Sequence, residues 1–213
     1  MKVKVKKEGK VKQFKLISSW EDVTLEKWLK LLNFEETTKS EEAEETIAVL
    51  SNIPRQLIKE LALLDVALIM SKIAELQAGQ NSSLRRIINI DGKEYGFHPN
   101  LESITLGEYA DLEHYIKAGL ETSLPEIMAI LYRPVTEKKN MVYTIEAYDG
   151  DISIRAEEMR KMSAQQVEAA LVFFWIFVND LLKILPSFLA EQMTEMTTQL
   201  QQKVSLKNGV GSE

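Results

Sequence analysis

The sequence predicts an α+β fold that is predominantly α-helical, with two β-hairpins that are each followed by helices and an apolar C-terminal helix at its centre. Two short stretches alternate apolar and polar residues around a glycine turn, which is typical of hairpins. The segments after them carry apolar residues at helical spacing. The two hairpin-plus-helices segments also resemble each other, which indicates an internal duplication. With 213 residues, 45% of them hydrophobic and 27% charged, the chain has the composition of a globular protein.

The first hairpin and its helices are expected in the N-terminal part of the chain. Residues 3–17 alternate around Gly9, and an amphipathic helix follows Thr24. Thr38 and Glu41 have the spacing of a capping box, in which each residue satisfies a backbone N–H of the other. The acidic stretch around them is therefore either a loop or the start of a second helix.

A long helix and a linker are expected to separate the two hairpins. Residues 56–77 show continuous amphipathic spacing, and residues 79–83 read GQNSS, a linker composition. Asp91-Gly92 then lies between two apolar, alternating runs. Because Asp-Gly readily forms the tight turn between antiparallel strands, it predicts the second hairpin.

Two further capping boxes are expected after the second hairpin. Thr105 with Glu108 and Ser123 with Glu126 have the required spacing, and Pro134 is expected to end the second of these helices. Each pair predicts the start of a helix.

The rest of the chain completes the predicted domain organisation. Residues 135–150 are expected to form an irregular arm with a short strand at 141–148, and Ser163 and Gln166 are expected to begin the apolar helix. The predicted divisions are a first lobe at 1–80 with a basic arm at 1–15, a related second lobe at 84–150, shared C-terminal helices at 151–203 and a tail at 204–213.

The internal repeat has a constant offset of 81 residues. The segment from Leu16 to Leu25 matches the segment from Phe97 to Leu106, and Trp28 then corresponds to Tyr109. In each copy a strand delivers an apolar residue and a threonine begins a helix. Each copy also continues to an apolar-proline pair, at residues 53–54 and 124–125. Duplicated modules of this kind are more typical of binding than of catalysis.

The most apolar stretch covers residues 170–189. Its unbroken apolar run, 169–178, is too short for a membrane span, which needs about 20 residues, and Asn179-Asp180 interrupts it. The run is apolar around the whole helix, so it is either the central helix of the fold or a helix whose second face meets another subunit. Replacement of Trp175 by alanine distinguishes the two alternatives. The chain should unfold if the helix is central, and should stay folded but fail to assemble if Trp175 contacts a partner.

Charge is unevenly distributed over the chain. The net charge is −6, but residues 1–15 carry seven lysines and one glutamate. This arm either binds DNA or an acidic neighbouring subunit, or is a solvated edge strand whose lysines prevent aggregation. The acidic residues at 35–45 either receive a basic partner, including the arm of another copy, or form a solvated loop.

No catalytic, cofactor or metal motif is evident, so no residue is assigned to such a role. The chain has no cysteine, which excludes disulfides and cysteine-based zinc sites. Asp111 and His114 could share a helix face and bind a metal, but no third ligand is indicated. Met193 and Met196 are either an adaptable binding surface or ordinary core residues.

Two stretches carry a family resemblance. "DVTLEKWLKL" with "TIAVLSNIPRQLIKELALLDVALI", and "ITLGEYADLEHYI" with "LPEIMAILYRPV", resemble small tail assembly proteins of tailed bacteriophages, including those of crAss-like phages. The resemblance implies a non-enzymatic structural protein, made in the host cytoplasm and incorporated into the virion at the neck, tail or capsid interior. The alternatives are a transient tail assembly chaperone and, remotely, a small enzyme or metal protein.

The implied partners are other phage structural proteins of the portal, neck or tail, in a homo-oligomer or another multi-copy assembly. No cofactor and no membrane contact are expected, and the basic arm could contact DNA. The candidate partner-binding residues combine the lysines of the arm with large apolar side chains near the C-terminus. They are Lys2, Lys4, Lys6, Lys7, Lys10, Lys12, Phe174, Trp175, Phe177, Met193 and Met196.

Overall fold

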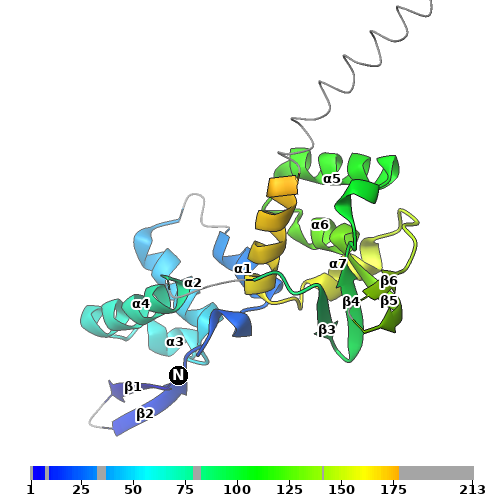
Figure 1. The fold of residues 1–213 in the computed structure, drawn as a ribbon. Helices are drawn as coiled ribbons and strands as arrows, with labels where there is room; N and C mark the ends of the chain where they lie inside the picture. The colour runs from blue at the N-terminus through cyan, green and yellow to red at the C-terminus, as the bar shows by residue number, and fades with distance from the viewer. Residues whose placement is uncertain (1, 8–9, 33–36, 79–82, 141, 178–213) are drawn as a thin grey trace, which may run out of the picture. The chain divides into compact units, whose positions relative to one another are not determined.

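The protein has a mixed α+β fold, as predicted (Figure 1). The structure, a computed structural model, describes residues 2–7, 10–32, 37–78, 83–140 and 142–177. The chain divides into two compact units, residues 1–170 and 171–213. Of the second unit, the structure describes residues 171–177.

The first half of unit 1 is a β-hairpin followed by short helices. The hairpin strands pair antiparallel, with Lys7 opposite Lys10, and the predicted turn at Gly9 lies outside the described residues. The elements in chain order are β1 (Lys2–Lys7), β2 (Lys10–Lys15), the 3-10 helix η1 (Trp20–Asp22), α1 (Leu25–Leu32), α2 (Lys39–Leu50), α3 (Arg55–Ile58) and α4 (Leu63–Ala78).

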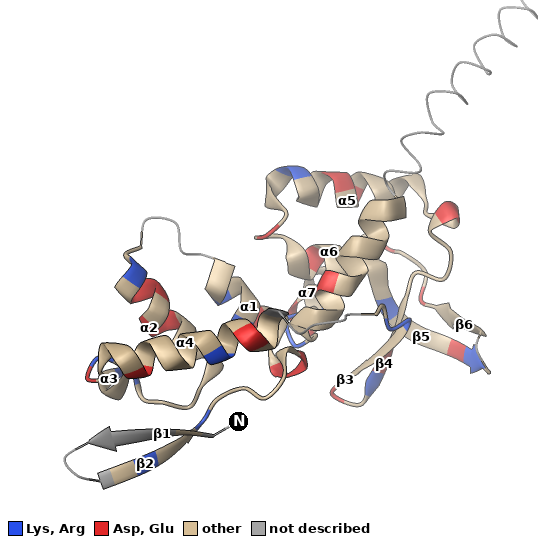
Figure 2. Ribbon diagram, turned by 60° about the vertical axis from the view of Figure 1, so that its left-hand side comes forward, with Lys and Arg blue, Asp and Glu red and all other residues tan. Residues whose placement is uncertain are grey.

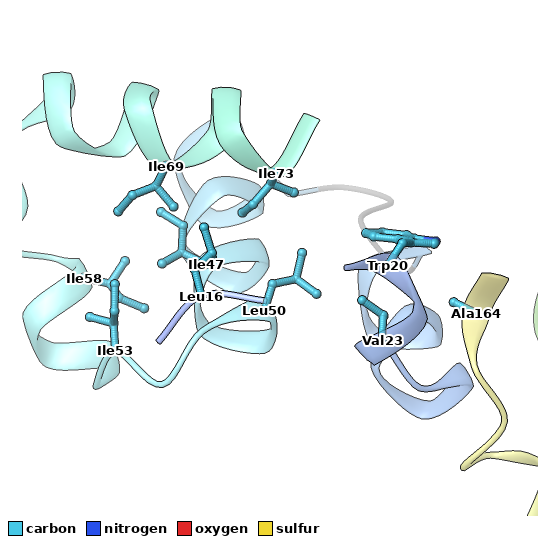
Figure 3. Close-up of a cluster of buried hydrophobic side chains, with 10 residues drawn as sticks. All are labelled: Leu16, Trp20, Val23, Ile47, Leu50, Ile53, Ile58, Ile69, Ile73 and Ala164. Atoms are coloured by element: carbon cyan, nitrogen blue, oxygen red, sulfur yellow. The ribbon is translucent and has the colours of Figure 1, made fainter. Parts of the chain in front are cut away.

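These helices enclose a hydrophobic cluster, shown in Figure 3. It joins Leu16 from the end of β2 to Ile47 and Leu50 of α2 and to Ile69 and Ile73 of α4. All five side chains are at most 5% exposed. Burying a side chain of this size stabilises the fold by about 1.5–3 kcal/mol, so this cluster holds the first half together.

The helix predicted over residues 56–77 is interrupted. The chain forms α3 and α4 separately, with residues 59–62 between them. A single straight helix would hold Ile58 and Ile73 roughly 22 Å apart along its axis. Both side chains belong to the same hydrophobic cluster. The break allows the two isoleucines to reach this cluster from different directions.

The second half of unit 1 contains a four-stranded antiparallel sheet in the order β3-β4-β5-β6. The predicted Asp91-Gly92 turn joins β3 and β4, and both residues have positive φ (51° and 84°). The elements are β3 (Ile87–Ile90), β4 (Lys93–Phe97), the 3-10 helix η2 (Leu101–Ser103), α5 (Leu106–Gly119), α6 (Leu124–Leu131), β5 (Tyr132–Lys139), β6 (Val142–Ile145) and α7 (Ser153–Met159).

The segment predicted as an irregular arm is partly regular. Residues 132–139 form β5, which was not predicted, and residues 142–145 form β6, which lies within the predicted short strand at 141–148. Helix α7 lies at the start of the predicted C-terminal helices at 151–203. Pro134 does not end α6, because the helix already ends at Leu131. It lies in β5, where its carbonyl accepts the Glu146 N–H.

Two of the predicted capping boxes are present and one is not. Thr38 with Glu41, and Thr105 with Glu108, satisfy each other's backbone N–H groups. Ser123 makes no side-chain cap hydrogen bond. Its backbone (φ −104°, ψ 14°) is not extended, whereas an N-cap side chain reaches the first turn from an extended backbone. A sequence pattern alone does not reveal this difference.

Each half contains the same backbone hydrogen bonds, and the bonded residues of the two halves are related by the predicted offset of 81 residues. The Ile17 N–H donates to the Leu50 carbonyl at 3.0 Å, and the His98 N–H donates to the Leu131 carbonyl at 2.7 Å. Each pair joins the residue after a hairpin to the last residue of a helix. The equivalent pairs, first half and then second, are Ile17–Leu50 and His98–Leu131, Leu16–Ser51 and Phe97–Tyr132, and Lys15–Asn52 and Gly96–Arg133.

The short 3-10 helices η1 and η2 are also equivalent. Each has a capping side chain at its N-cap, Ser19 in the first half and Asn100 in the second. Each begins with a buried apolar residue, Trp20 or Leu101. The described parts of residues 15–52 therefore share these features with residues 96–133. This correspondence is longer than the ten matched sequence positions.

The two apolar-proline pairs both lie at the start of a helix, as predicted, but they are not at equivalent positions of the repeat. Pro54 is the N-cap of α3, whereas Pro125 lies in the first turn of α6. At the common offset, Ile53-Pro54 corresponds instead to Pro134-Val135 in β5.

The copies differ in what covers the start of their first helix. Leu25 is fully buried, and its N–H donates to the Met162 carbonyl at 2.7 Å. The Ala164 N–H donates to the Val23 carbonyl at 2.8 Å. The equivalent leucine of the second copy, Leu106, is 84% exposed. The segment around residues 160–164 therefore covers the start of the first helix in the first copy but not in the second.

Candidate interaction surfaces

A charged cluster is buried in the second copy. It consists of Glu108 from α5, Arg133 from β5 and His98, which follows β4, and all three are at most 7% exposed. The Arg133 guanidinium lies 2.7 Å from the Glu108 carboxylate, and the His98 Nε2 lies 3.6 Å from it. A buried charge is costly unless it is paired, so these residues depend on one another.

The surroundings of the charged cluster shift the pKa values of its members. Burial alone would raise the pKa of Glu108, but hydrogen bonds from Thr105 and the charge of Arg133 hold it below 4.5. Burial lowers the pKa of His98 below 6.5, although Glu108 opposes this effect. Glu108 is therefore ionised and His98 neutral at pH 7.

This cluster predicts a loss of stability in mild acid. Because the pKa of His98 is lower in the folded state, the unfolded state binds more protons as the pH falls through about 6.5. The free energy of unfolding should therefore decrease between pH 7.5 and pH 5, as measured by urea denaturation. The decrease should be smaller in His98→Asn. The exposed His114 provides the matched control, and His114→Asn should retain the full decrease.

Two tyrosines cover the charged cluster and the strand beside it. The Tyr143 hydroxyl of β6 donates to the Phe97 carbonyl at 2.6 Å. Its ring also occupies the space beside Gly96, where a Cβ atom would lie only 2.5 Å from the tyrosine Cε2. Arg133 lies 5.8 Å from the centre of the Tyr148 ring. Residues 142–148 thus close this site.

The equivalent place in the first copy is an open cleft. The cleft has a volume of about 630 Å³ and lies between the end of β2 and the end of α2. Lys15, Lys27 and Asn52 line it, at the positions equivalent to Gly96, Glu108 and Arg133. The sequence did not predict this cleft. The opposite charges of Lys27 and Glu108, which are equivalent at the offset of 81 residues, could have indicated that the two sites differ.

The apolar helix carries a second candidate surface. It covers residues 164–177 of the described chain. Ala164 and Ala170 are fully buried, as expected for a central helix. From residue 172 onwards, exposed apolar side chains appear, and Trp175 is 55% exposed. The members of this apolar surface are Val172, Phe173, Trp175 and Ile176.

The C-terminal candidate residues differ in their burial. Phe174 is only 2% exposed, so it does not belong to the apolar surface that includes Trp175, contrary to expectation. Phe177 is partly exposed. Met193 and Met196 lie outside the described residues. Trp175 is therefore the candidate whose exposure best fits a partner contact.

The candidate lysines lie in the N-terminal hairpin. Val3 and Phe14 pack against the hydrophobic cluster and anchor the hairpin at one end. Lys12 is exposed on β2. The candidate lysines are Lys2, Lys4, Lys6 and Lys7 in β1, and Lys10 and Lys12 in β2.

The acidic stretch is largely the helix α2, whose glutamates appear in red in Figure 2. Some of them are paired within the chain. Glu45 forms a salt bridge with Arg55 at 2.6 Å, and Glu44 lies 3.6 Å from Lys59. These pairs reduce the negative charge that α2 presents to a basic partner.

The remote metal hypothesis gains no support from the neighbourhood of Asp111. Its carboxylate accepts a hydrogen bond from the Tyr148 hydroxyl at 2.5 Å. The His114 ring packs edge-on against Tyr115, with centroids 5.2 Å apart. Within the described parts of the chain, no group of three or more His, Asp or Glu side chains could hold a metal ion.

Among the residues that the structure describes, no helix has the length and hydropathy needed to cross a bilayer.

Comparison of the chain with protein-family models, with curated proteins and with solved structures finds no match.

Proposed function

We propose that this chain is a non-enzymatic protein that acts by protein–protein assembly. The observation that carries this proposal is the apolar surface formed by Val172, Phe173, Trp175 and Ile176, of which Trp175 is 55% exposed. Clustered large apolar side chains on a surface typically mark sites of protein interaction. A few residues contribute most of the binding energy at such sites, and tryptophan is one of the three residue types enriched among them.

Helix α4 supports the same proposal with a further exposed surface. Leu63, Leu64 and Leu68 are 87%, 72% and 55% exposed. Leu64 and Leu68 are four residues apart, so they lie on the same side of the helix. A chain with apolar residues exposed on more than one element is suited to contact more than one neighbour, as a multi-copy assembly requires.

We further propose that the assembly is a bacteriophage virion, in which the chain contacts portal, neck or tail proteins. The resemblance of its capped helices to small phage tail assembly proteins supports this assignment. The lysine-rich hairpin would serve as an electrostatic contact with DNA or with an acidic neighbour. The same surfaces would also suit a transient tail assembly chaperone, which would leave before the particle matures.

Replacement of Trp175 by alanine tests the assembly role. Because the side chain is 55% exposed, the free energy of unfolding should change by less than about 1 kcal/mol, and the circular dichroism spectrum should be retained. Incorporation of the variant into particles, measured by sedimentation and immunoblotting, should be lost.

Trp20 provides the matched control, since it is only 4% exposed. Its replacement by alanine should destabilise the chain by about 3–5 kcal/mol and so reveal what a core tryptophan contributes. If Trp175→Ala unfolds the chain as Trp20→Ala does, or is incorporated normally, the apolar surface does not serve assembly.

A further inference from the structure

Helix α4 has apolar residues on two faces, and the chain itself covers one of them. Ile69 and Ile73 belong to the hydrophobic cluster and are at most 5% exposed (Figure 3). On the outer face, Leu64 and Leu68 are 72% and 55% exposed. Only three of the 16 residues of α4 are charged. A helix that is apolar on both faces is usually covered on both, so the outer face of α4 is suited to a partner.

The outer face of α4 has the residue spacing of a helix that pairs with another helix. Leu64, Leu68, Ser71 and Glu75 follow one another at intervals of four, three and four residues. These are the intervals between the two contact positions of a heptad repeat, which lie on one line along a helix. All four side chains are exposed, and we call this line of residues the α4 seam. Its two leucines supply the apolar area, and its serine leaves room for a facing side chain.

The residues that flank the α4 seam are oppositely charged along one edge and small along the other. Asp65 and Lys72 lie along one edge, and Ala67 and Ala74 lie along the other. Asp65 and Lys72 are seven residues apart, which places them about 10 Å apart along the helix axis, too far to pair with each other. Within the described chain, neither of them forms a salt bridge. Each charge can therefore pair with a residue of another helix.

We propose that the α4 seams of two copies of this chain pair antiparallel across a two-fold axis. In an antiparallel helix pair, positions along the same edge face each other. Asp65 of one copy therefore meets Lys72 of the other, and the two-fold axis repeats this salt bridge. Along the other edge Ala67 meets Ala74, and these small side chains let the two helices approach closely. Leu68 packs beside the axis in both copies.

The charge pattern of α4 favours a second copy, and an antiparallel one, because it is complementary to itself. A parallel pair would place Glu75 opposite Glu75, and it would bring Asp65 and Lys72 beside alanines. Two helices about 24 Å long form a small interface, so the association is weak and depends on concentration. The inference rests on the proposed role in assembly, because it assigns a partner to one of the surfaces that support that role.

Sedimentation equilibrium of the full-length chain is the first test. Between about 1 and 500 µM, the chain should show an equilibrium between monomer and dimer. Leu68→Gln should weaken dimerisation at least about tenfold and retain the circular dichroism spectrum, because the Leu68 side chain is 55% exposed. Leu106→Gln is the matched control, since Leu106 is 84% exposed and lies on α5. This variant should dimerise within about twofold of the original chain.

Exchange of the two flanking charges is the second test. Asp65→Lys and Lys72→Asp should each weaken dimerisation about tenfold, because each places like charges opposite each other twice. The double variant that combines both substitutions has the net charge of the original chain and should restore dimerisation to within about threefold. An equimolar mixture of the two single variants should form a heterodimer, because opposite charges then face each other at both ends of the seam.

Three results would overturn the proposal. One is a chain that stays monomeric over the whole concentration range, which would leave the outer face of α4 to a different protein. Another is a dimer that Leu68→Gln does not weaken, which would place the interface elsewhere. The third is a double variant that fails to dimerise while the original chain does, which would exclude antiparallel pairing of Asp65 with Lys72.

Failure of this inference and failure of the assembly role are distinguishable. Trp175→Ala should leave the α4 dimer unchanged, because Trp175 lies outside α4. A monomeric chain whose incorporation into particles still depends on Trp175 would refute only the pairing of α4. A dimer that Leu68→Gln disrupts, in a chain whose Trp175→Ala variant is incorporated normally, would support the pairing and contradict the role proposed for the apolar surface.

Discussion

Replacement of Glu108 by alanine is expected to lower the free energy of unfolding by about 3–5 kcal/mol, because it leaves the buried Arg133 without a counter-charge. Arg133 is 4% exposed, and its guanidinium lies 2.7 Å from the Glu108 carboxylate. The same substitution removes the carboxylate that accepts the Thr105 N–H at 2.7 Å in the capping box of α5. Urea denaturation followed by circular dichroism measures the loss.

Two further variants show whether burial of the charge is the cause. Glu113 lies on the same helix but pairs with Lys117 at the surface, so Glu113→Ala should cost less than about 0.5 kcal/mol. Arg133→Met in the Glu108→Ala background removes the unpaired charge and should restore part of the lost stability. Equal effects of Glu108→Ala and Glu113→Ala would show that Glu108 and Arg133 are not coupled in a buried pair.

Replacement of Gly96 by valine is expected to cost about 3 kcal/mol, at the upper end of the range for overpacking. A Cβ at residue 96 would lie 2.5 Å from Tyr143 Cε2 and 2.8 Å from Ile145 Cγ2. The Tyr143 ring is buried and held by its hydrogen bond to the Phe97 carbonyl, so it cannot move aside without losing that bond. Thermal unfolding measures the effect, and the near-ultraviolet circular dichroism signal of the tyrosines should change.

Gly107 is the matched control for Gly96. A Cβ added there meets no atom within 4 Å, and the residue lies in the first turn of α5. Because glycine and valine differ little in helix propensity, Gly107→Val should change the free energy of unfolding by less than about 0.5 kcal/mol. If Gly96→Val were as mild as Gly107→Val, Tyr143 would not be held against β4 as described.

The sequence predicted those elements whose signals are local. Asp91-Gly92 predicted the turn between β3 and β4, and Thr38 and Thr105 predicted the starts of α2 and α5. Each signal depends on residues within one turn of one another. Ser123 had the same pattern but a different backbone conformation, and the pattern was therefore insufficient.

Elements that depend on distant contacts were predicted less well. The break between α3 and α4 follows from packing Ile58 and Ile73 into one cluster, which local periodicity does not encode. Strand β5 follows a buried helix directly, and Pro134 within it argues against a strand at this position. Its place in the sheet comes from pairing with β4 and β6.

The charged cluster was missed for a similar reason. Glu108 was recognised only as a capping residue, and His98 and Arg133 are far from it in sequence. The repeat offset could have located the cluster, because it aligns Glu108 with Lys27 and Arg133 with Asn52. Differences between equivalent positions indicate where the two halves differ in chemistry, and both the charged cluster and the open cleft lie at those positions.

Quantitative mass spectrometry of purified phage particles from the source system tests the proposed function most directly. The account predicts that the chain is present in mature particles at a fixed copy number compatible with the symmetry of the neck, tail or capsid. Absence of the chain from particles, together with its presence in the infected-cell lysate, would contradict incorporation into the virion and favour the transient chaperone. Absence of any associated phage would contradict the virion assignment altogether.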